Sequence, residues 1–207
     1  MSVAGSTLHT WLALGDSYTV GESVEPPDRY PVQAAKMLGD AGFYFSEPEI
    51  IARTGWTANE LLKAVNEKKI PFLPYDLVSL LIGVNDQYQG GSLAEYREEF
   101  KALLLRSIQM AGGNPARVIV LSIPDYSVTP YARNSEPFFI SRQIDSFNEA
   151  NKELAERYSL HYINITEESR KAAVDPALIA GDGLHYSGKE YAVWARLLVS
   201  RAREILK

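Results

Sequence analysis

Short apolar runs alternate with amphipathic stretches along the chain. Each run is three to six residues long, which favours strands over helices. Two of the runs are nearly continuous in Val, Leu and Ile, as expected for strands that are covered on both faces. The five runs span residues 11–14, 50–52, 77–82, 118–123 and 162–165.

The stretches between the runs carry helical periodicity and helix start signals. Thr57 with Glu60, and Ser92 with Glu95, fit the capping box, in which Ser or Thr is followed three residues later by Glu. Apolar residues recur at helical spacing after Ser92, and the Gly112-Gly113 pair is expected to end that helix. Two more helices are predicted: one carries apolar positions from 139 to 158, and the last begins at Ser187 with Glu190 three residues later.

Strands that alternate with helices predict an α/β fold, with a parallel sheet between helical layers and right-handed connections. Because there is no internal repeat and no linker rich in Gly, Ser or Pro, residues 1–207 are interpreted as one domain. The longest irregular stretch, 124–137, directly follows the fourth run. A loop of that length in a compact domain is often functional.

The amino-acid composition excludes several kinds of catalytic and binding site. The chain has no cysteine, which excludes disulfides, thiolate metal sites and a cysteine nucleophile. The net charge is −5 and the longest basic run is Lys68-Lys69, so nucleic acid is not the expected partner. No apolar stretch reaches the roughly 18 residues of a membrane span.

The first ten residues lack the features of a signal peptide. We therefore expect a cytoplasmic location, or export with the leader absent from this chain. Neither a cofactor nor a metal is expected, because three scattered histidines do not form a metal cluster. The sequence leaves the oligomeric state open.

Candidate chemistry lies where the predicted strands end, because ligands bind open parallel sheets outside the carboxyl ends of the strands. The first run leads to Ser17, the second to Gly55 and the third to Asn85. The fifth run leads, after a helical segment, to Asp182 and His185. One edge of the sheet is therefore predicted to hold a serine, a glycine amide, an asparagine and an Asp/His pair.

This combination suits acyl transfer. A serine hydroxyl needs a neighbouring base, and histidine is suited to that role near neutral pH. A carboxylate on the other ring nitrogen fixes the histidine tautomer, and backbone amides or an Asn side chain can stabilise an oxyanion. Of the three histidines, His9 lies in an unpatterned segment and His161 begins a predicted strand. His185, in a loop three residues after Asp182, is the candidate base.

Each motif alone has a structural explanation. Ser17 could cap a helix, Gly55 could be a turn glycine, and Asn85 could bond its own backbone. Arg53 could steer an anionic substrate or pair with a nearby acid, and pairing is the favoured interpretation.

A phosphate-binding loop is a rival interpretation for residues 183–189, which fit Gly-x₄-Gly-Lys. It is disfavoured because Glu190 replaces the required Ser or Thr and no strand runs directly into the motif. A capping box formed by Ser187 and Glu190 explains the same residues better.

Together, in this order, the motifs resemble those of the SGNH hydrolase superfamily, the GDSL-type esterases and lipases. The four blocks are Gly15-Asp16-Ser17-Tyr18-Thr19-Val20-Gly21, Arg53-Thr54-Gly55-Trp56-Thr57, Gly83-Val84-Asn85-Asp86 and Asp182-Gly183-Leu184-His185. The resemblance implies that Ser17 is the nucleophile, His185 the base and Asp182 its orienting acid. It also implies an oxyanion hole made by the Ser17 and Gly55 amides and the Asn85 side chain.

The resemblance further implies a flavodoxin-like three-layer α/β/α sandwich with a five-stranded parallel sheet in the order 2-1-3-4-5. Thr19 stands where the Gly-x-Ser-x-Gly elbow of α/β-hydrolases has its last glycine, which separates the two folds.

The implied activity is that of a serine esterase or acylhydrolase (lipase-like) acting on a small-molecule carboxylic ester. Removal of acetyl groups from carbohydrates by the same triad is an alternative, and a non-catalytic binding module of the same fold is a third. Tyr126, Val128 and Tyr131, in the aromatic 124–137 segment, are candidate pocket residues, although packing over the sheet edge is an equal explanation.

Overall fold

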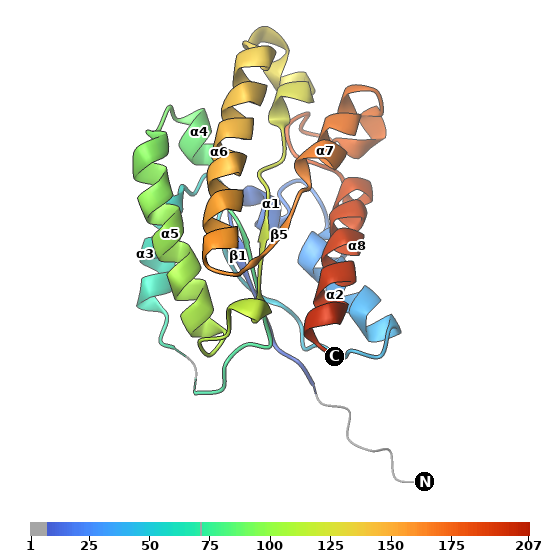
Figure 1. Ribbon diagram of the computed structural model, residues 1–207. Coiled ribbons are helices and arrows are strands. Elements are labelled where there is room, and N and C mark those ends of the chain that lie inside the picture. The colour runs from blue at the N-terminus through green and yellow to red at the C-terminus, as the bar shows by residue number, and fades with distance from the viewer. Residues whose placement is uncertain (1–7, 71) are drawn as a thin grey trace.

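The computed structural model describes residues 8–70 and 72–207, which form a five-stranded parallel sheet in the order β2-β1-β3-β4-β5 (Figure 1). The predicted fold and strand order are thus confirmed. β1 pairs with β2 on one side and with β3 on the other, so the carboxyl ends of these three strands lie together. The strands are β1 (Trp11–Gly15), β2 (Glu49–Ala52), β3 (Leu77–Leu81), β4 (Val118–Leu121) and β5 (His161–Ile163).

Helices cover both faces of the sheet (Figure 1). α2 (Tyr30–Asp40) and α8 (Gly188–Ile205) pack together on one face, and α3 (Ala58–Glu67), α5 (Leu93–Met110) and α6 (Pro137–Arg157) lie on the other. Right-handed crossovers explain this division, because the chain moves outward from β1 to β2 and then returns across the sheet to β3, β4 and β5. Three short helices, α1 (Ser17–Val20), α4 (Val84–Tyr88) and α7 (Thr166–Ser169), lie near strand ends.

The core is densest around the two central strands. Every residue of β1 and β3 is buried, which matches their continuous apolar sequences. The polar exception is Ser79, whose hydroxyl accepts a hydrogen bond from Trp11 Nε1 at 3.0 Å, so both buried polar groups are satisfied. This packing gives the loops at the strand ends a rigid base.

Of the predicted capping boxes, the one at Thr57 and Glu60 is fully formed. The predicted box at Ser187 and Glu190 is wrong. Ser187 Oγ donates to the Ala177 carbonyl at 2.7 Å, and the buried Glu190 carboxylate accepts a hydrogen bond from Trp194 Nε1 at 2.6 Å. Tertiary contacts on α8 have therefore replaced the local partners that the sequence pattern suggested.

The segment after β4 is more regular than its sequence predicted. Residues 124–137 contain two 3₁₀ helices, η3 (Tyr126–Val128) and η4 (Pro130–Asn134). Tyr126 is buried, and the neighbouring Asp125 carbonyl accepts a hydrogen bond from the Tyr186 hydroxyl at 2.8 Å. The segment is thereby fixed against the region that carries His185.

Candidate active site

Ser17 is the first residue of α1, directly after β1. The Asp16 carboxylate accepts a hydrogen bond from the Tyr18 amide at 3.0 Å, and the Asp16 carbonyl accepts from the Thr19 and Val20 amides. These bonds fix a sharp strand-to-helix turn that holds the Ser17 side chain at the end of the sheet. Ser17 is 5% exposed, so its hydroxyl lies in a largely water-excluded position.

The Asp16 carboxyl group is completely buried behind this turn. Burial raises the pKa of Asp16 to about 8, against the opposing effect of the Tyr18 amide hydrogen bond. At neutral pH the group is therefore mostly protonated. The turn is therefore held by a carboxyl group that is largely neutral.

The Gly55 loop and the β3–α4 turn are tied to each other. Asn85 Nδ2 donates to the Trp56 carbonyl at 2.9 Å, which uses one of its two hydrogens and leaves the other for a ligand. Both carboxylate oxygens of Asp86 accept from the Ala58 amide, at 3.0 and 3.2 Å. The bonds hold the Gly55 amide and the Asn85 side chain in a fixed mutual position.

Two glycines make these turns possible. Gly55 has φ +86° and Gly83 has φ +125°, conformations that side chains with a Cβ atom rarely adopt. At Gly83 a Cβ would also lie 2.5 Å from the Tyr96 hydroxyl. Substitution at Gly83 would therefore move the start of α4, and Asn85 with it.

His185 and Asp182 are held by a network of hydrogen bonds. His185 Nδ1 lies 2.6 Å from Asp182 Oδ2, and the same carboxylate accepts from the Leu184 and His185 amides, each at 2.9 Å. Ser23 Oγ donates to Asp182 Oδ2 at 2.7 Å. Partial burial would raise the pKa of Asp182, but the hydrogen bonds from His185, the Leu184 amide and Ser23 outweigh it and hold the pKa well below its usual range.

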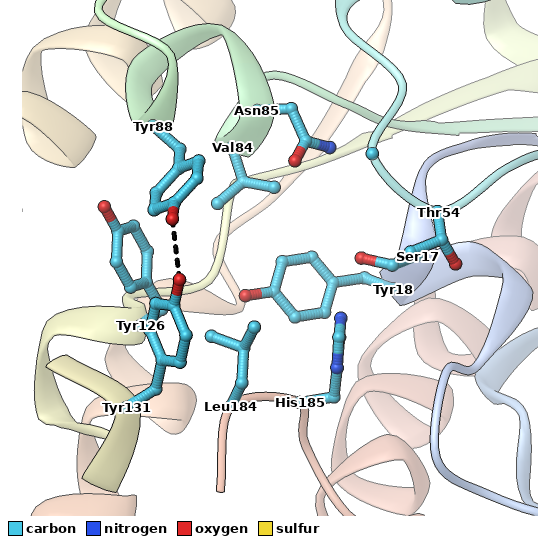
Figure 2. A pocket seen from close by; sticks show the side chains of 11 residues that line it. Ser17, Tyr18, Thr54, Val84, Asn85, Tyr88, Tyr126, Tyr131, Leu184 and His185 are labelled. Carbon is cyan, nitrogen blue, oxygen red and sulfur yellow. Dashed lines mark hydrogen bonds between the residues drawn. The ribbon is translucent and has the colours of Figure 1, made fainter. Parts of the chain in front are cut away.

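The carboxylate therefore remains ionised at neutral pH and fixes the orientation of the imidazole. The other ring nitrogen points toward Ser17 (Figure 2). The Tyr18 ring meets the imidazole edge-on, with centroids 5.7 Å apart. Among the described residues no hydrogen bond yet joins the Ser17 hydroxyl to His185, a contact that often tightens only when substrate binds.

These groups open into one cavity of about 140 Å³, which we call the Ser17 cavity (Figure 2). Its wall is largely aromatic and aliphatic, with polar groups gathered at one end, as is usual for small-molecule sites. It is lined by Ser17, Tyr18, Thr54, Gly55, Val84, Asn85, Tyr88, Tyr126, Tyr131, Leu184 and His185.

The Ser17 cavity brings together most of the residues that the sequence singled out. Asp182 lies behind His185 rather than on the cavity wall. Tyr126 and Tyr131 line the cavity, whereas Val128 lines a separate cavity between η4 and the segment before His185. Ser23 and Tyr88 were not anticipated. Tyr88 could have been found, because it lies one helical turn after Asn85 and so shares its face of α4.

Two rival interpretations of nearby residues do not describe this structure. Lys189 Nζ pairs with Asp175 at 2.7 Å, so it is held away from the role of a phosphate-binding lysine. Arg53 is exposed and forms no ion pair with any described residue, so the favoured pairing with an acid is wrong. The described part of the chain also contains no group of three or more His, Cys, Asp or Glu that could hold a metal ion.

Comparison with models of protein families matches residues 13–193 to the GDSL-like lipase/acylhydrolase family. The chain belongs to this family, and is accordingly a hydrolase of the acylhydrolase and esterase type. No curated protein matched the chain. None of the helices that the structure describes is long and apolar enough to cross a membrane.

Solved structures share the fold at low sequence identity. TesA is 16% identical, with a TM-score of 0.73 over 95% of this chain and 99% of that one. Axe2, an acetylxylan esterase from Geobacillus stearothermophilus, is 20% identical, with a TM-score of 0.71 over 94% of each chain. The psychrotrophic esterase EstA from Pseudoalteromonas sp. is 17% identical, with a TM-score of 0.70 over 96% of this chain and 98% of that one.

Proposed function

We propose that this protein is a serine hydrolase of carboxylic esters that works through an acyl-enzyme on Ser17. The observation that carries the proposal is the convergence of Ser17, Asn85 and the Asp182–His185 pair at one end of the Ser17 cavity. The hydrogen bond between His185 and Asp182 supports the proposal, as does membership of a family of acylhydrolases.

In the first half-reaction, His185 Nε2 takes the Ser17 proton as Ser17 Oγ bonds to the ester carbonyl carbon. The resulting oxyanion accepts hydrogen bonds from the Ser17 and Gly55 amides and from the free hydrogen of Asn85 Nδ2. His185 then gives its proton to the alcohol oxygen as the carbon–oxygen bond breaks, which leaves the acyl group on Ser17.

In the second half-reaction, a water molecule replaces the alcohol. His185 takes a proton from the water as its oxygen bonds to the acyl carbon, and returns that proton to Ser17 as the carboxylic acid leaves. Throughout both steps the ionised Asp182 stabilises the positive charge on the imidazole.

Removal of acetyl groups from carbohydrates by the same residues is the second candidate. The small volume of the Ser17 cavity favours a short acyl group, which an acetylated sugar also supplies.

The test is a set of initial hydrolysis rates on aryl esters from acetate to decanoate and on acetylated sugars, with Ser17→Ala as the control. We expect hydrolysis of short-chain esters that Ser17→Ala abolishes, and a mass increase of one phosphonyl group on Ser17 after treatment with a p-nitrophenyl alkylphosphonate, which transfers its phosphonyl group to Ser17 Oγ and releases p-nitrophenol. Normal hydrolysis by Ser17→Ala would overturn the assignment of the nucleophile. Faster turnover of acetylated sugars than of aryl acetate would favour the deacetylase.

A further inference from the structure

Two tyrosines meet across one end of the Ser17 cavity. The hydroxyls of Tyr88 and Tyr131 are 2.6 Å apart and share a hydrogen bond, and their ring centroids are 6.3 Å apart. Figure 2 shows the pair at the far end of the cavity from Ser17, beyond Leu184. The pair therefore forms a wall that faces the reacting centre along the length of the cavity.

The two tyrosines come from opposite sides of the active site. Tyr88 is the last residue of α4, the helix that carries Asn85, and the edge of its ring meets Tyr126 with centroids 6.1 Å apart. The Tyr131 amide donates to the Gly183 carbonyl at 2.9 Å, in the loop that carries His185. The hydroxyl bridge thus links the oxyanion side of the site to the base side.

The wall has solvent on its outer side. Tyr88 is 56% exposed and Tyr131 is 48% exposed, whereas Tyr126 beneath them is 4% exposed. Tyr126 lies beside the pair at the same end of the cavity, whereas the other labelled residues lie on its sides or at the Ser17 end (Figure 2). Because the Tyr88 and Tyr131 rings are both partly exposed, loss of either ring would extend the cavity toward solvent at this end.

We propose that the hydrogen-bonded Tyr88–Tyr131 pair closes the acyl end of the Ser17 cavity and restricts the enzyme to esters of short carboxylic acids. This inference rests on the proposed function. The cavity volume of about 140 Å³ is well below the ~300–1,000 Å³ that is usual for small-molecule sites, so it suits a short acyl group.

The bridge favours the protonated form of the Tyr131 hydroxyl. The hydrogen bond to Tyr88, together with a little burial, raises the pKa of the Tyr131 hydroxyl above its usual value. Tyr131 therefore keeps its proton at mildly alkaline pH.

The test compares kcat/KM for aryl octanoate with kcat/KM for aryl acetate in the wild type, Tyr88→Ala, Tyr131→Ala and Tyr131→Phe. We expect the octanoate-to-acetate ratio to rise roughly 10- to 100-fold in both Ala variants, because the lengthened cavity can bury additional methylenes of the octanoyl chain. Tyr131→Phe keeps the ring and loses the bridge, so its ratio is expected to rise by less, about threefold. Phe139→Ala, which removes an exposed ring outside the cavity, is the matched control and should leave the ratio unchanged.

A wild-type ratio in both Ala variants, with hydrolysis still dependent on Ser17, would overturn the proposed closure and leave the esterase proposal intact. A wild-type ratio in Tyr131→Phe would overturn the role of the hydrogen bond.

Octanoate binding, measured by calorimetry in a Ser17→Ala background, tests whether the tyrosine pair closes the cavity without relying on ester hydrolysis. We expect Tyr131→Ala to bind octanoate at least tenfold more tightly than the Ser17→Ala parent, whether or not a suitable ester is hydrolysed. Equal affinities would overturn the closure, whereas absence of Ser17-dependent hydrolysis alone would overturn the proposed function.

Discussion

The Asn85 side chain is positioned by a single hydrogen bond. Because Nδ2 donates one hydrogen to the Trp56 carbonyl at 2.9 Å, the direction of the second hydrogen is fixed before any ligand arrives. Such a preorganised donor acts mainly in the transition state, where negative charge develops on the carbonyl oxygen.

Asn85→Ala is therefore expected to lower kcat by ~10²–10³ with a much smaller change in KM. Steady-state kinetics on a short aryl ester would measure both values. A change confined to KM would contradict an oxyanion role, since it would mean that Asn85 contributes equally to ground-state and transition-state binding.

Ser23 supports the same centre from a strained backbone position. Its φ is +65°, a value uncommon for residues other than glycine, and its hydroxyl donates to Asp182 at 2.7 Å. Strain of this kind is often retained at functional sites, where it positions a group. We interpret Ser23 as a positioning residue that acts through Asp182 on His185.

Ser23→Gly should accordingly separate activity from stability. Glycine accepts the same φ without strain, so the free energy of unfolding should stay within about 1 kcal/mol of the wild type. Loss of one hydrogen bond to the carboxylate should lower kcat about tenfold with KM nearly unchanged. Ser159→Gly, at φ +59° near the end of α6, is the matched control and should leave kcat unaltered. Equal kcat values for the two variants would contradict the role of Ser23.

At the scale of elements, the N-terminus of α3 joins two parts of the proposed oxyanion hole. Thr57 and Glu60 cap the helix locally, whereas Asp86 reaches the Ala58 amide from the β3–α4 turn. Burial raises the pKa of Asp86 to about 6, against the opposing effect of the Ala58 amide hydrogen bond. The link therefore carries an ionised carboxylate at neutral pH.

Asp86→Ala is expected to lower kcat roughly tenfold, because the Gly55 loop and Asn85 lose their mutual position. The same substitution should lower the free energy of unfolding by about 1–3 kcal/mol, because the Ala58 amide loses its acceptor. Asp86→Asn keeps an acceptor oxygen for the Ala58 amide and should restore most of kcat. Glu60→Ala, which removes the local capping contact of the same helix, should reduce stability without reducing kcat. If Glu60→Ala slows catalysis as much as Asp86→Ala does, general loosening of α3 is the better explanation.

The element pattern was largely predictable from sequence, whereas several side-chain partners were not. Continuous apolar runs predict buried parallel strands because each strand must be covered on both faces, and β1 and β3 fulfil that condition. The Ser187–Glu190 pattern failed because Trp194, one helical turn after Glu190, supplies a buried donor that no local rule includes. Ser23 could not be linked to Asp182, since 159 residues separate them and only the folded chain brings them together.

At the scale of the molecule, parallel strand order explains why residues distant in the sequence share one cavity. β2, β1 and β3 are neighbours, so the loops that follow them carry Gly55, Ser17 and Asn85 to the same edge of the sheet. The shared edge followed from the alternation of strands and helices, whereas the strand order was implied by the family resemblance. The contact between Tyr88 and Tyr131 at the far end of the cavity could not be predicted, because it depends on the path of the segment after β4.

In the described part of the chain, burial also raises the pKa of three carboxyl groups enough for their protonation to affect the stability of the fold. Burial raises the pKa of Asp16 to about 8, of Glu190 to about 7 and of Asp86 to about 6. Each group keeps its proton in the folded state to a higher pH than in the unfolded chain, where an Asp or Glu loses it near pH 4. The stability contribution is therefore complete below about pH 4 and is lost as the pH rises through each folded pKa.

We expect the free energy of unfolding to fall between pH 5 and 8, by up to about 1.4 kcal/mol per pH unit for each group that still holds its proton. Asp16→Asn and Glu190→Gln replace the ionisable group with a neutral amide, so each should flatten this decline, as measured by urea unfolding at several pH values. Asp175→Asn is the control, because its exposed carboxylate pairs with Lys189 and has a lowered pKa. A decline that is equally steep in Asp16→Asn, Glu190→Gln and the wild type would show that these buried carboxyls do not govern stability across this range.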